Sequence, residues 1–261
     1  MIMADLHVHS TFSDGKLSVA ELVDFYGERE FGCIAITDHI CEERGLWGKA
    51  AGLLRYTLSA ENFDQYLETL RAEGERAWDQ YRMMLIPGYE LSKNSWSNHR
   101  SAHILGLGVS RWLSAESDIL ALTRGLREQG ALSIAAHPVH TGNWEPQTLH
   151  LWDRREELRH EFDAWEVASG AKWFEQVASS GLPMVASSDL HQPRQIHAWK
   201  TLLNLRRGES NPEAYLEAIR LQRIEFQFWS EPETASHPTR IRSAQRRPEA
   251  SATGGAVTAW A

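Results

Sequence analysis

The stretch ADLHVHSTFSDG, residues 4–15, places two histidines one residue apart and follows them with a Ser-Asp-Gly turn. Side chains two residues apart on a strand project from the same face, so His7 and His9 are expected to point the same way. Such a pair is suited either to burial or to metal binding. A single His-x-His motif does not distinguish the two, and the other polar motifs of the chain have to decide.

The composition indicates a globular protein of ordinary size. The chain has 261 residues, 42% of them hydrophobic, which fits one large domain or two small ones. A formal net charge of -8 disfavours a long nucleic acid as partner, because an acidic surface repels polyanions. Cys33 and Cys41 are expected to be reduced thiols. With no secretion signal and no apolar run of membrane-spanning length, we expect a soluble cytoplasmic protein without a membrane partner.

The first 230 residues alternate short apolar runs with segments of helical period. Several runs are nearly continuous in Ile, Val, Leu and Ala, as in strands that are covered on both faces of a parallel sheet. The runs are residues 4–9, 32–39, 83–91, 102–109, 131–138, 162–169 and 183–190. This repeated alternation predicts an α/β barrel or an open doubly wound sheet.

Three sequence signals mark helix starts. Ser18 followed by Glu21 has the spacing of a capping box. The pair Asn211-Pro212 places a proline at the first position of a late helix. Ser59 is expected to cap the helix that carries the apolar positions 63, 66, 67 and 70.

The composition changes near Glu231. Residues 231–261 are rich in Pro, Ser, Ala, Thr and Gly and show no apolar period. We expect a disordered tail there, because such a segment buries too little apolar surface to offset the loss of chain entropy. Residues 1–230 are then the folded domain.

Metal-binding residue types collect at the ends of the predicted strands. In parallel α/β folds the loops at the carboxyl ends of the strands build the active site. Six imidazoles and three carboxylates are expected to meet there: His7, His9, Asp14, His39, Glu90, His103, His137, Asp189 and His191. In a shared core so many polar groups would be left without partners, whereas metal ions would satisfy them. Nine donors are too many for one tetrahedral ion and suit two or three divalent ions, with Mn, Zn and Fe as candidates.

The ordered motifs D-x-H-x-H, SDG, TDH, a lone Glu, a lone His, AHP and SDLH resemble the polymerase-and-histidinol-phosphatase (PHP) family over residues 3–230. The resemblance implies a distorted (β/α)7, TIM-like barrel and a trinuclear metal centre that hydrolyses phosphoesters through a metal-bound hydroxide. It also implies three ligand sets, with Glu90 shared between two ions: His7, His9, Glu90 and Asp189; Asp14, His39 and His191; Glu90, His103 and His137. The chain departs from the family pattern after TDH, and residues 41–82 and 92–101 are expected to flank the mouth as a lid.

The implied centre favours a compact anionic substrate. Three divalent ions and three carboxylates leave roughly +3 inside an acidic protein, which suits a phosphomonoester such as a nucleotide or a sugar phosphate. Asp14, Glu90, Asp189 and Arg194 are the predicted catalytic residues. Arg194, Arg100 and Lys16 are the predicted phosphate contacts, with arginine preferred because a guanidinium pairs with phosphate through two hydrogen bonds.

Alternative functions remain open at this stage. An exonuclease or nucleotide-bisphosphate phosphatase of the same family would share the metal site but would need a basic groove for the strand. An amidohydrolase-type barrel also opens on His-x-His, but usually has a bridging lysine where Glu90 stands. A metal-binding module without activity is disfavoured, because none of the nine donors is missing. Asp5 and Asp38 are candidates for orienting imidazoles, and Glu166 is expected to be a hydrogen-bonded structural residue.

Overall fold

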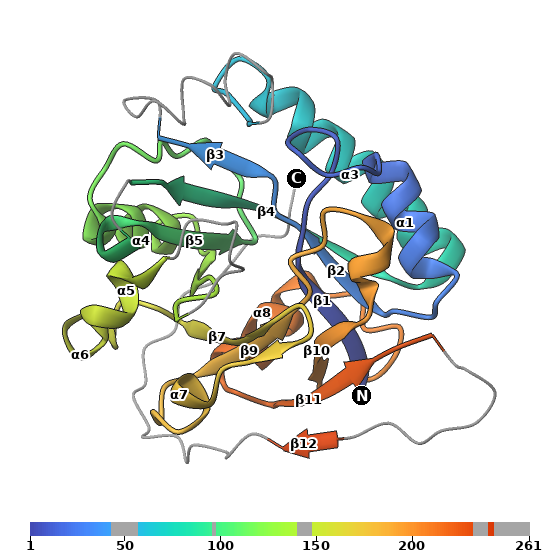
Figure 1. Cartoon of the computed structure of the whole chain (residues 1–261). Helices are drawn as coiled ribbons and strands as arrows, with labels where there is room; N and C mark the ends of the chain where they lie inside the picture. Colours follow the sequence, from blue (N-terminus) through green and yellow to red (C-terminus); the bar gives the residue numbers. More distant parts are fainter. Residues whose placement is uncertain (43–56, 96–97, 140–147, 232–239, 243–261) are drawn as a thin grey trace, which may run out of the picture.

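The computed structural model describes residues 1–42, 57–95, 98–139, 148–231 and 240–242. In this part of the chain a single curled sheet forms the centre of the molecule (Figure 1). Its strands are β1 (Ile2–Val8), β2 (Cys33–Ile36), β3 (His39–Cys41), β4 (Met84–Lys93), β5 (Ala102–Leu107), β6 (Leu132–Ala135), β7 (Ala164–Ser169), β8 (Lys172–Trp173), β9 (Met184–Ser187), β10 (Ala198–Leu203), β11 (Ile224–Trp229) and β12 (Arg240–Arg242). Their order is β12-β11-β10-β1-β2-β4-β5-β6-β7-β8, with β3 beside β4 and β9 beside β7.

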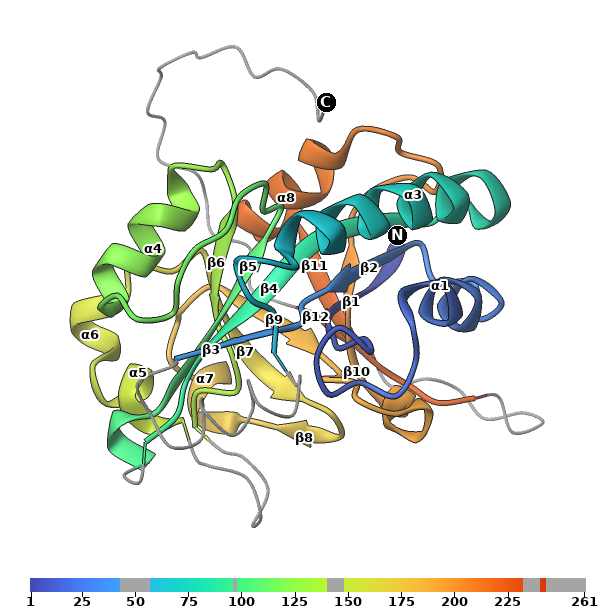
Figure 2. The ribbon, with the colours of Figure 1, turned by 90° about the horizontal axis from the view of Figure 1, so that it is seen from above.

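The helices pack around the outside of this sheet (Figure 2). They are α1 (Val19–Gly27), α3 (Phe63–Tyr81), α4 (Ile119–Arg127), α5 (Leu149–Asp153), α6 (Arg155–Leu158), α7 (Glu175–Ala178) and α8 (Pro212–Arg220), with short 3-10 turns at η1 (Asn98–Arg100) and η2 (Pro193–Ile196). Helices α1 and α3 lie together on the side of β2 and β4, and α4 to α6 lie at the other end. The α/β class predicted from the sequence is confirmed.

The sheet is mixed, which departs from a regular succession of parallel βα units. Strands β1, β2 and β4 are parallel, as are β6, β7 and β9. Between these groups β5 runs antiparallel to both β4 and β6, because a short connection returns the chain directly from β4. Beyond β1 the antiparallel strands β10, β11 and β12 extend the edge. The sequence periodicity had not indicated β10 or β11 as strands.

The curled sheet closes on itself where β9 returns to β1. An isolated parallel bridge joins Val8 to Leu190, and the backbone N–H of His9 donates to the carbonyl of Leu190 at 2.9 Å. On the other side of β9, the hydroxyl of Thr201 accepts from the N–H of Ala186 at 3.0 Å and lies 2.9 Å from its carbonyl. These contacts bring the end of β9 beside the end of β1, where the opening histidines lie.

Two of the three predicted helix starts are confirmed. Ser18 and Glu21 form a capping box at α1, and the side chain of Asn211 caps α8. The prediction for Ser59 is wrong, because α3 begins at Phe63 with Asn62 at the N-cap. The amide oxygen of Asn62 accepts from the backbone N–H of Ser59 and turns the chain before the helix begins.

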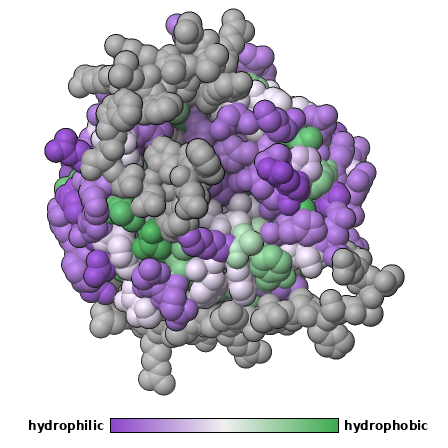
Figure 3. Space-filling model, viewed as in Figure 1, coloured by the Kyte–Doolittle hydropathy of each residue, from purple (hydrophilic) through white to green (hydrophobic). Residues whose placement is uncertain are grey.

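The core and the surface follow the apolar pattern. Large exposed hydrophobic side chains are few among the described residues (Met1, Leu120 and Leu221), and the face in Figure 3 is mostly hydrophilic with small apolar patches. None of the helices that the structure describes could cross a membrane. Within the predicted tail, residues 240–242 pair with β11, which a wholly disordered tail would not do. The rest of residues 232–261 lies outside the described residues.

Candidate metal centre

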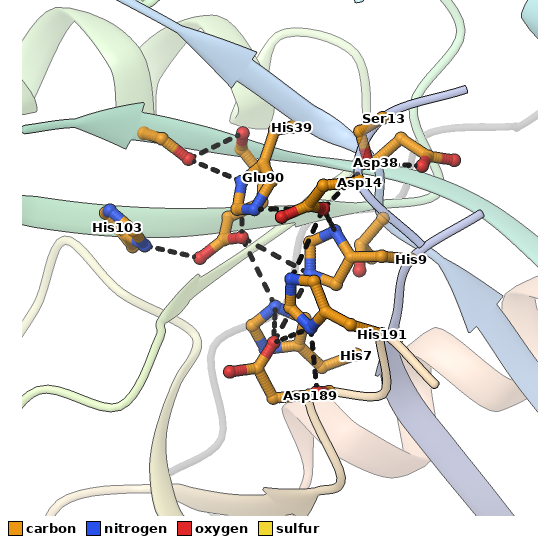
Figure 4. Close-up of polar contacts among 12 residues, drawn as sticks. His7, His9, Ser13, Asp14, Asp38, His39, Glu90, His103, Asp189 and His191 are labelled. Carbon is orange, nitrogen blue, oxygen red and sulfur yellow. Dashed lines mark hydrogen bonds and ion pairs between the residues drawn. The ribbon is translucent and has the colours of Figure 1, made fainter. Parts of the chain in front are cut away.

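All nine predicted donors come to one rim of the sheet (Figure 4 labels eight of them). His7 and His9 lie at the carboxyl end of β1, and Glu90 pairs in register with His39 of the parallel β3. His103 lies near the amino end of β5, whereas His7 and His9 lie at the carboxyl end of their strand. It reaches the same rim because β5 runs antiparallel to β4, which places His103 opposite Ser92.

Hydrogen bonds to Asp38 fix the Ser-Asp-Gly turn. This buried carboxylate accepts hydrogen bonds from the N–H and hydroxyl of Ser10 at 2.8 and 2.6 Å, and from the hydroxyl of Ser13 at 2.6 Å. A Cβ at Gly15 would lie 2.2 Å from the carbonyl oxygen of His9, so only glycine fits there. Asp38 therefore positions the turn that carries Asp14, and the expectation that it orients an imidazole is wrong.

The first group of donors surrounds a common point. His7 Nε2 lies 3.4 Å from Glu90 Oε2 and 3.3 Å from Asp189 Oδ1. His9 Nε2 lies 3.5 Å from Glu90 Oε2 and 3.3 Å from Asp189 Oδ1. Ligands at about 2.1 Å from a tetrahedral ion lie about 3.4 Å from one another. Each of the two imidazole nitrogens therefore lies at ligand spacing from a Glu90 oxygen and from an Asp189 oxygen.

Two further groups flank the first. Asp14 Oδ1 lies 3.6 Å from His39 Nε2 and 3.3 Å from His191 Nε2. On the other side, Glu90 Oε1 lies 2.8 Å from His103 Nδ1 and 3.3 Å from His137 Nε2. The two oxygens of Glu90 thus face different groups, as a bridging ligand requires.

Several of these polar atoms have no hydrogen-bond partner although they are buried. They are His7 Nε2 and both ring nitrogens of His9, in side chains that are wholly inaccessible to solvent, whereas the buried Glu90 Oε2 lies 2.9 Å from His39 Nδ1. Leaving a buried polar atom unpaired costs about 1–3 kcal/mol, and more for a charged group. So many unpaired lone pairs at one point fit a bound cation.

Electrostatics divides the cluster into acidic and basic partners. Burial opposes ionisation of Glu90 and Asp189, but the surrounding imidazoles outweigh it and hold the pKa of both carboxyls well below the usual range. Burial also lowers the pKa of His191, yet the hydrogen bond to Asp14 and the charge of Asp189 outweigh it and raise this pKa to about 10. His9 is the opposite case, since burial and the neighbouring imidazoles lower its pKa to about 3.

Asp5 supports the turn that carries Asp189. Its carboxylate accepts from the N–H and hydroxyl of Ser188 at 2.9 and 2.5 Å, and from the hydroxyl of Tyr26 at 2.7 Å. Asp189 itself has φ +54°, in the region that L-residues rarely adopt. Asp5 thus stabilises a strained backbone, and the expectation that it orients an imidazole is wrong.

Some imidazole partners gave no signal in the sequence. His103 Nε2 lies 2.9 Å from Asn94 Oδ1, His39 Nδ1 lies 2.8 Å from Ser92 Oγ, and His137 Nδ1 lies 3.1 Å from Thr148 Oγ1. Single Asn, Ser and Thr residues carry no recognisable period or spacing. Only the folded chain identifies them as partners.

The side chains of the predicted phosphate contacts make no described contact with the nine donors. Arg194 on η2 and Lys16 are exposed, although the backbone N–H of Lys16 donates to the carbonyl of His191 at 2.8 Å and so places Lys16 at the rim. Arg100 on η1 lines a separate cavity of about 240 Å³ with Lys93, His150 and Arg154. The structure does not bring these three side chains together.

Cavity size does not identify the site. A larger cavity of about 920 Å³ lies between α3, β4 and α8 and contains none of the nine donors. Most of the segment 57–82, part of the expected lid, is the helix α3 (residues 63–81). This helix packs on α1 and β4. Residues 43–56 and 96–97, which belong to the same expectation, lie outside the described residues.

Comparison with known proteins agrees with this geometry. The family model described as PHP domain matches residues 5–162, more than half of the 261 residues. The 5'-3' exoribonuclease Rnm of Escherichia coli (strain K12) is 31% identical over 134 residues, which cover 51% of this chain and 37% of that protein. A 3',5'-nucleoside bisphosphate phosphatase of Chromobacterium violaceum is 30% identical over 128 residues, which cover 49% of this chain and 34% of that protein. The chain thus spans about a third of the length of the curated relatives it matches.

Among solved structures, the fold is shared with a two-domain protein of Bacteroides vulgatus that is described as containing a predicted PHP-like metal-dependent phosphoesterase. The TM-score is 0.62 at 22% sequence identity, and the match covers 87% of this chain and 64% of the other. At this identity the comparison shows a common architecture.

Proposed function

Because this chain belongs to the PHP domain family, we propose that it is a metal-dependent phosphoesterase that hydrolyses a small phosphomonoester at the nine-donor cluster. The observation that carries the proposal is the first group of donors. His7 Nε2 and His9 Nε2 each lie 3.3–3.5 Å from Glu90 Oε2 and from Asp189 Oδ1. Both nitrogens are buried without a hydrogen-bond partner, and a cation bound between them and the carboxylates would satisfy them.

The cluster suits two or three divalent ions. The proposed sets are His7, His9, Glu90 and Asp189 for the first ion, Asp14, His39 and His191 for the second, and Glu90, His103 and His137 for the third. The ligand atoms of the third set lie together, as do those of the second with His9 and those of His7, His9 and Glu90, whereas Asp189 lies in a group with His7 and His137. Mixed imidazole and carboxylate donors fit Zn, Mn or Fe and disfavour Ca or Mg, which prefer oxygen ligands. Glu90 is proposed to bridge the first and third ions, since its two oxygens face different groups.

Bound ions would polarise the phosphoryl oxygens and lower the pKa of a coordinated water to near 7. The protein's own residues then have separate tasks. Asp14, Glu90 and Asp189 balance the charge of the ions and keep their positions fixed through the turns that Asp38 and Asp5 hold. Arg194, Arg100 and Lys16 are proposed to bind phosphate from the surface around the rim, with the substrate bridging the intervening space.

The charge of the centre selects the substrate class. Two or three divalent ions against three carboxylates leave a net positive charge of roughly 1 to 3, which attracts a compact dianion more than a neutral amide. An amidohydrolase-type reaction is disfavoured for the same reason. Small phosphorylated metabolites and nucleotides are therefore the proposed substrates.

A second candidate is hydrolysis of a nucleoside bisphosphate or of the end of a short oligonucleotide. The cavity lined by Arg100, Lys93, His150 and Arg154 favours it, because a second phosphate would find cationic side chains there. The same cavity is lined by Asp118, and Lys93 and Arg154 are paired with Glu42 and Glu157, so Arg100 is the cation we propose for this phosphate. By name, one of the two relatives is an exoribonuclease and the other a nucleoside bisphosphate phosphatase. We propose residues 1–230 as the catalytic domain in either case.

The test combines metal analysis with a substrate panel. The purified protein is expected to contain two or three equivalents of Mn, Zn or Fe, and to hydrolyse p-nitrophenyl phosphate when supplied with Mn²⁺. The variant His9→Ala is expected to lose metal and about 100-fold or more of the activity. The matched control is His160→Ala, because His160 is exposed and lies outside the cluster.

The panel separates the two candidates. Hydrolysis of simple monoesters supports the first, whereas turnover restricted to adenosine 3',5'-bisphosphate or a short oligoribonucleotide supports the second. A pure wild-type protein without bound transition metal and without activity on any of these compounds would refute both.

A further inference from the structure

Glu166 of β7 is wholly buried beside the donor cluster but is directed at two of its members and not at their centre. Its Oε1 lies 3.0 Å from His7 Nδ1, and its Oε2 accepts a 2.7 Å hydrogen bond from the backbone N–H of His137. No group of potential metal ligands among the described residues includes Glu166. Because both oxygens are directed at these two donors, we do not assign the carboxylate as a tenth ligand.

The contact with His7 decides which ring nitrogen carries a proton. A carboxylate only accepts hydrogen bonds, so His7 donates from Nδ1 to Glu166. Nε2 can then carry a lone pair toward Glu90 and Asp189, as a metal ligand requires. Without Glu166, those two carboxylates would attract the ring proton to Nε2 and block the ligand position.

The contact with His137 holds a strained backbone. His137 has φ +27°, outside the regions that L-residues prefer. Glu166 accepts from its N–H, and the hydroxyl of Thr148 donates to its carbonyl at 2.8 Å. This conformation places His137 Nε2 3.3 Å from Glu90 Oε1. One carboxylate therefore orients a member of the first set and a member of the third.

Both strands are irregular at this contact. The pairing of β1 with β2 shifts register between Asp5 and Val8, and the pairing of β7 with β9 shifts between Glu166 and Ala168. An extra residue in one strand redirects neighbouring side chains, and such bulges recur beside active sites. The bulges thus lie where His7 and Glu166 turn toward each other across the rim.

We propose that Glu166 is a positioning residue that couples two metal sites, by setting the protonated nitrogen of His7 and by holding the backbone of His137. The proposal rests on the proposed function in one respect, namely that His7 and His137 bind metal. It assigns Glu166 no contact with the substrate or the ions.

The variant Glu166→Gln tests the proposal because it keeps the shape and removes one acceptor. The glutamine oxygen can accept from either His137 N–H or His7 Nδ1–H, and the amide N–H₂ then faces the other group. We expect zinc affinity at the first and third sets to fall at least tenfold, while the ion held by Asp14, His39 and His191 is retained. Metal content after dialysis against a weak chelator measures this difference.

The spectroscopic test uses protein with ¹⁵N-labelled histidine. In the wild type, a slowly exchanging His7 Nδ1–H proton bonded to the buried Glu166 carboxylate is expected far downfield, with or without zinc. Glu166→Gln should shift this resonance upfield or remove it. The control Asp163→Asn alters another carboxylate of the same region, which accepts from Ser133, and should leave both the resonance and the metal content unchanged.

The outcomes separate this proposal from the proposed function. A wild type that binds no metal but shows the resonance refutes the metal centre and supports the Glu166–His7 contact. A wild type without the resonance overturns the role of Glu166, and this measurement needs no variant to fold. Equal loss of all ions in Glu166→Gln and Asp163→Asn would also overturn it, because that pattern indicates general destabilisation.

Discussion

Lys200 Nζ lies 2.7 Å from Asp5 Oδ2, and both side chains are wholly buried where β10 pairs with β1. Burial lowers the pKa of Lys200, and the charge of Asp5 offsets this lowering only in part. Asp5 also holds Ser188 and so the turn of Asp189. The ion pair therefore connects β10, which the apolar period of the sequence does not indicate, to the proposed metal centre.

Lys200→Met is expected to destabilise the protein by about 3 kcal/mol, because it leaves the carboxylate of Asp5 buried without its counter-charge. Urea unfolding measures the change. Lys172→Met removes an exposed lysine and should alter stability by less than about 0.5 kcal/mol. Equal stability of the two variants would contradict the role of the ion pair.

Gly15→Ala is expected to abolish the ion held by Asp14, because the new Cβ would overlap the carbonyl oxygen of His9 and force the turn open. Metal stoichiometry should fall by about one equivalent, with thermal stability reduced as well. Gly74→Ala is the contrasting substitution. Gly74 lies inside α3 with ordinary contact distances around its Cβ position, so alanine should stabilise by about 0.5–1 kcal/mol. A Gly15→Ala protein with full metal content would refute the first expectation.

Metal removal is expected to lower the melting temperature. A ligand at about 100 times its dissociation constant stabilises the folded state by about 2.7 kcal/mol. For a domain of this size, that corresponds to roughly 5–10 °C. Differential scanning calorimetry with Mn²⁺ or Zn²⁺ and with a chelator measures the difference, and identical melting curves would argue against bound ions.

The pH dependence of stability should differ between the metal-free and metal-loaded protein. In the metal-free protein the pKa of His191 is raised to about 10, and those of His7, His39 and His137 are also raised. Groups with a raised pKa contribute stability that is complete below about pH 6.5 and is lost as pH rises through the folded-state pKa. The lowered pKa values of His9 and His103 have the opposite effect on stability, but these two histidines are outnumbered by the four whose pKa is raised. The metal-free protein should therefore become less stable from about pH 6.5 upward.

Metal binding follows the opposite trend, because each imidazole must lose its proton to become a ligand. The difference in melting temperature between loaded and metal-free protein should widen from about pH 6.5 to pH 9, and metal content and activity should fall together below about pH 6.5. Melting curves at several pH values, with manganese or with chelator, check both signs. A difference that narrows as pH rises would contradict the assignment of the histidines as ligands.

Individual ligand variants should remove individual ions. His39→Ala is expected to lose the ion shared with Asp14 and His191, and His103→Ala the ion shared with Glu90 and His137. Native mass spectrometry resolves the number of ions in each variant. Loss of every ion in both variants would indicate one cooperative cluster in place of three sets.

The sequence by itself determined the α/β class and singled out the nine residues that lie together in the structure and that we propose as donors, because both depend on local information. The period of apolar residues and the positions of strand ends can be recognised in short stretches of sequence. Helix starts can be recognised in the same way, as the capping box of Ser18 and Glu21 shows. The order of the seven polar motifs is specific enough to indicate the family from the sequence alone.

Only the tertiary structure decided how the donors are oriented and supported. The antiparallel course of β5 brings His103 to the rim, and it depends on pairing between strands, which a linear pattern does not encode. Glu166 is 159 positions from His7 along the chain, and Asp5 is 183 positions from Ser188. Contacts of this kind form because the curled sheet closes β9 onto β1, so their partners are set by long-range packing and not by neighbouring residues.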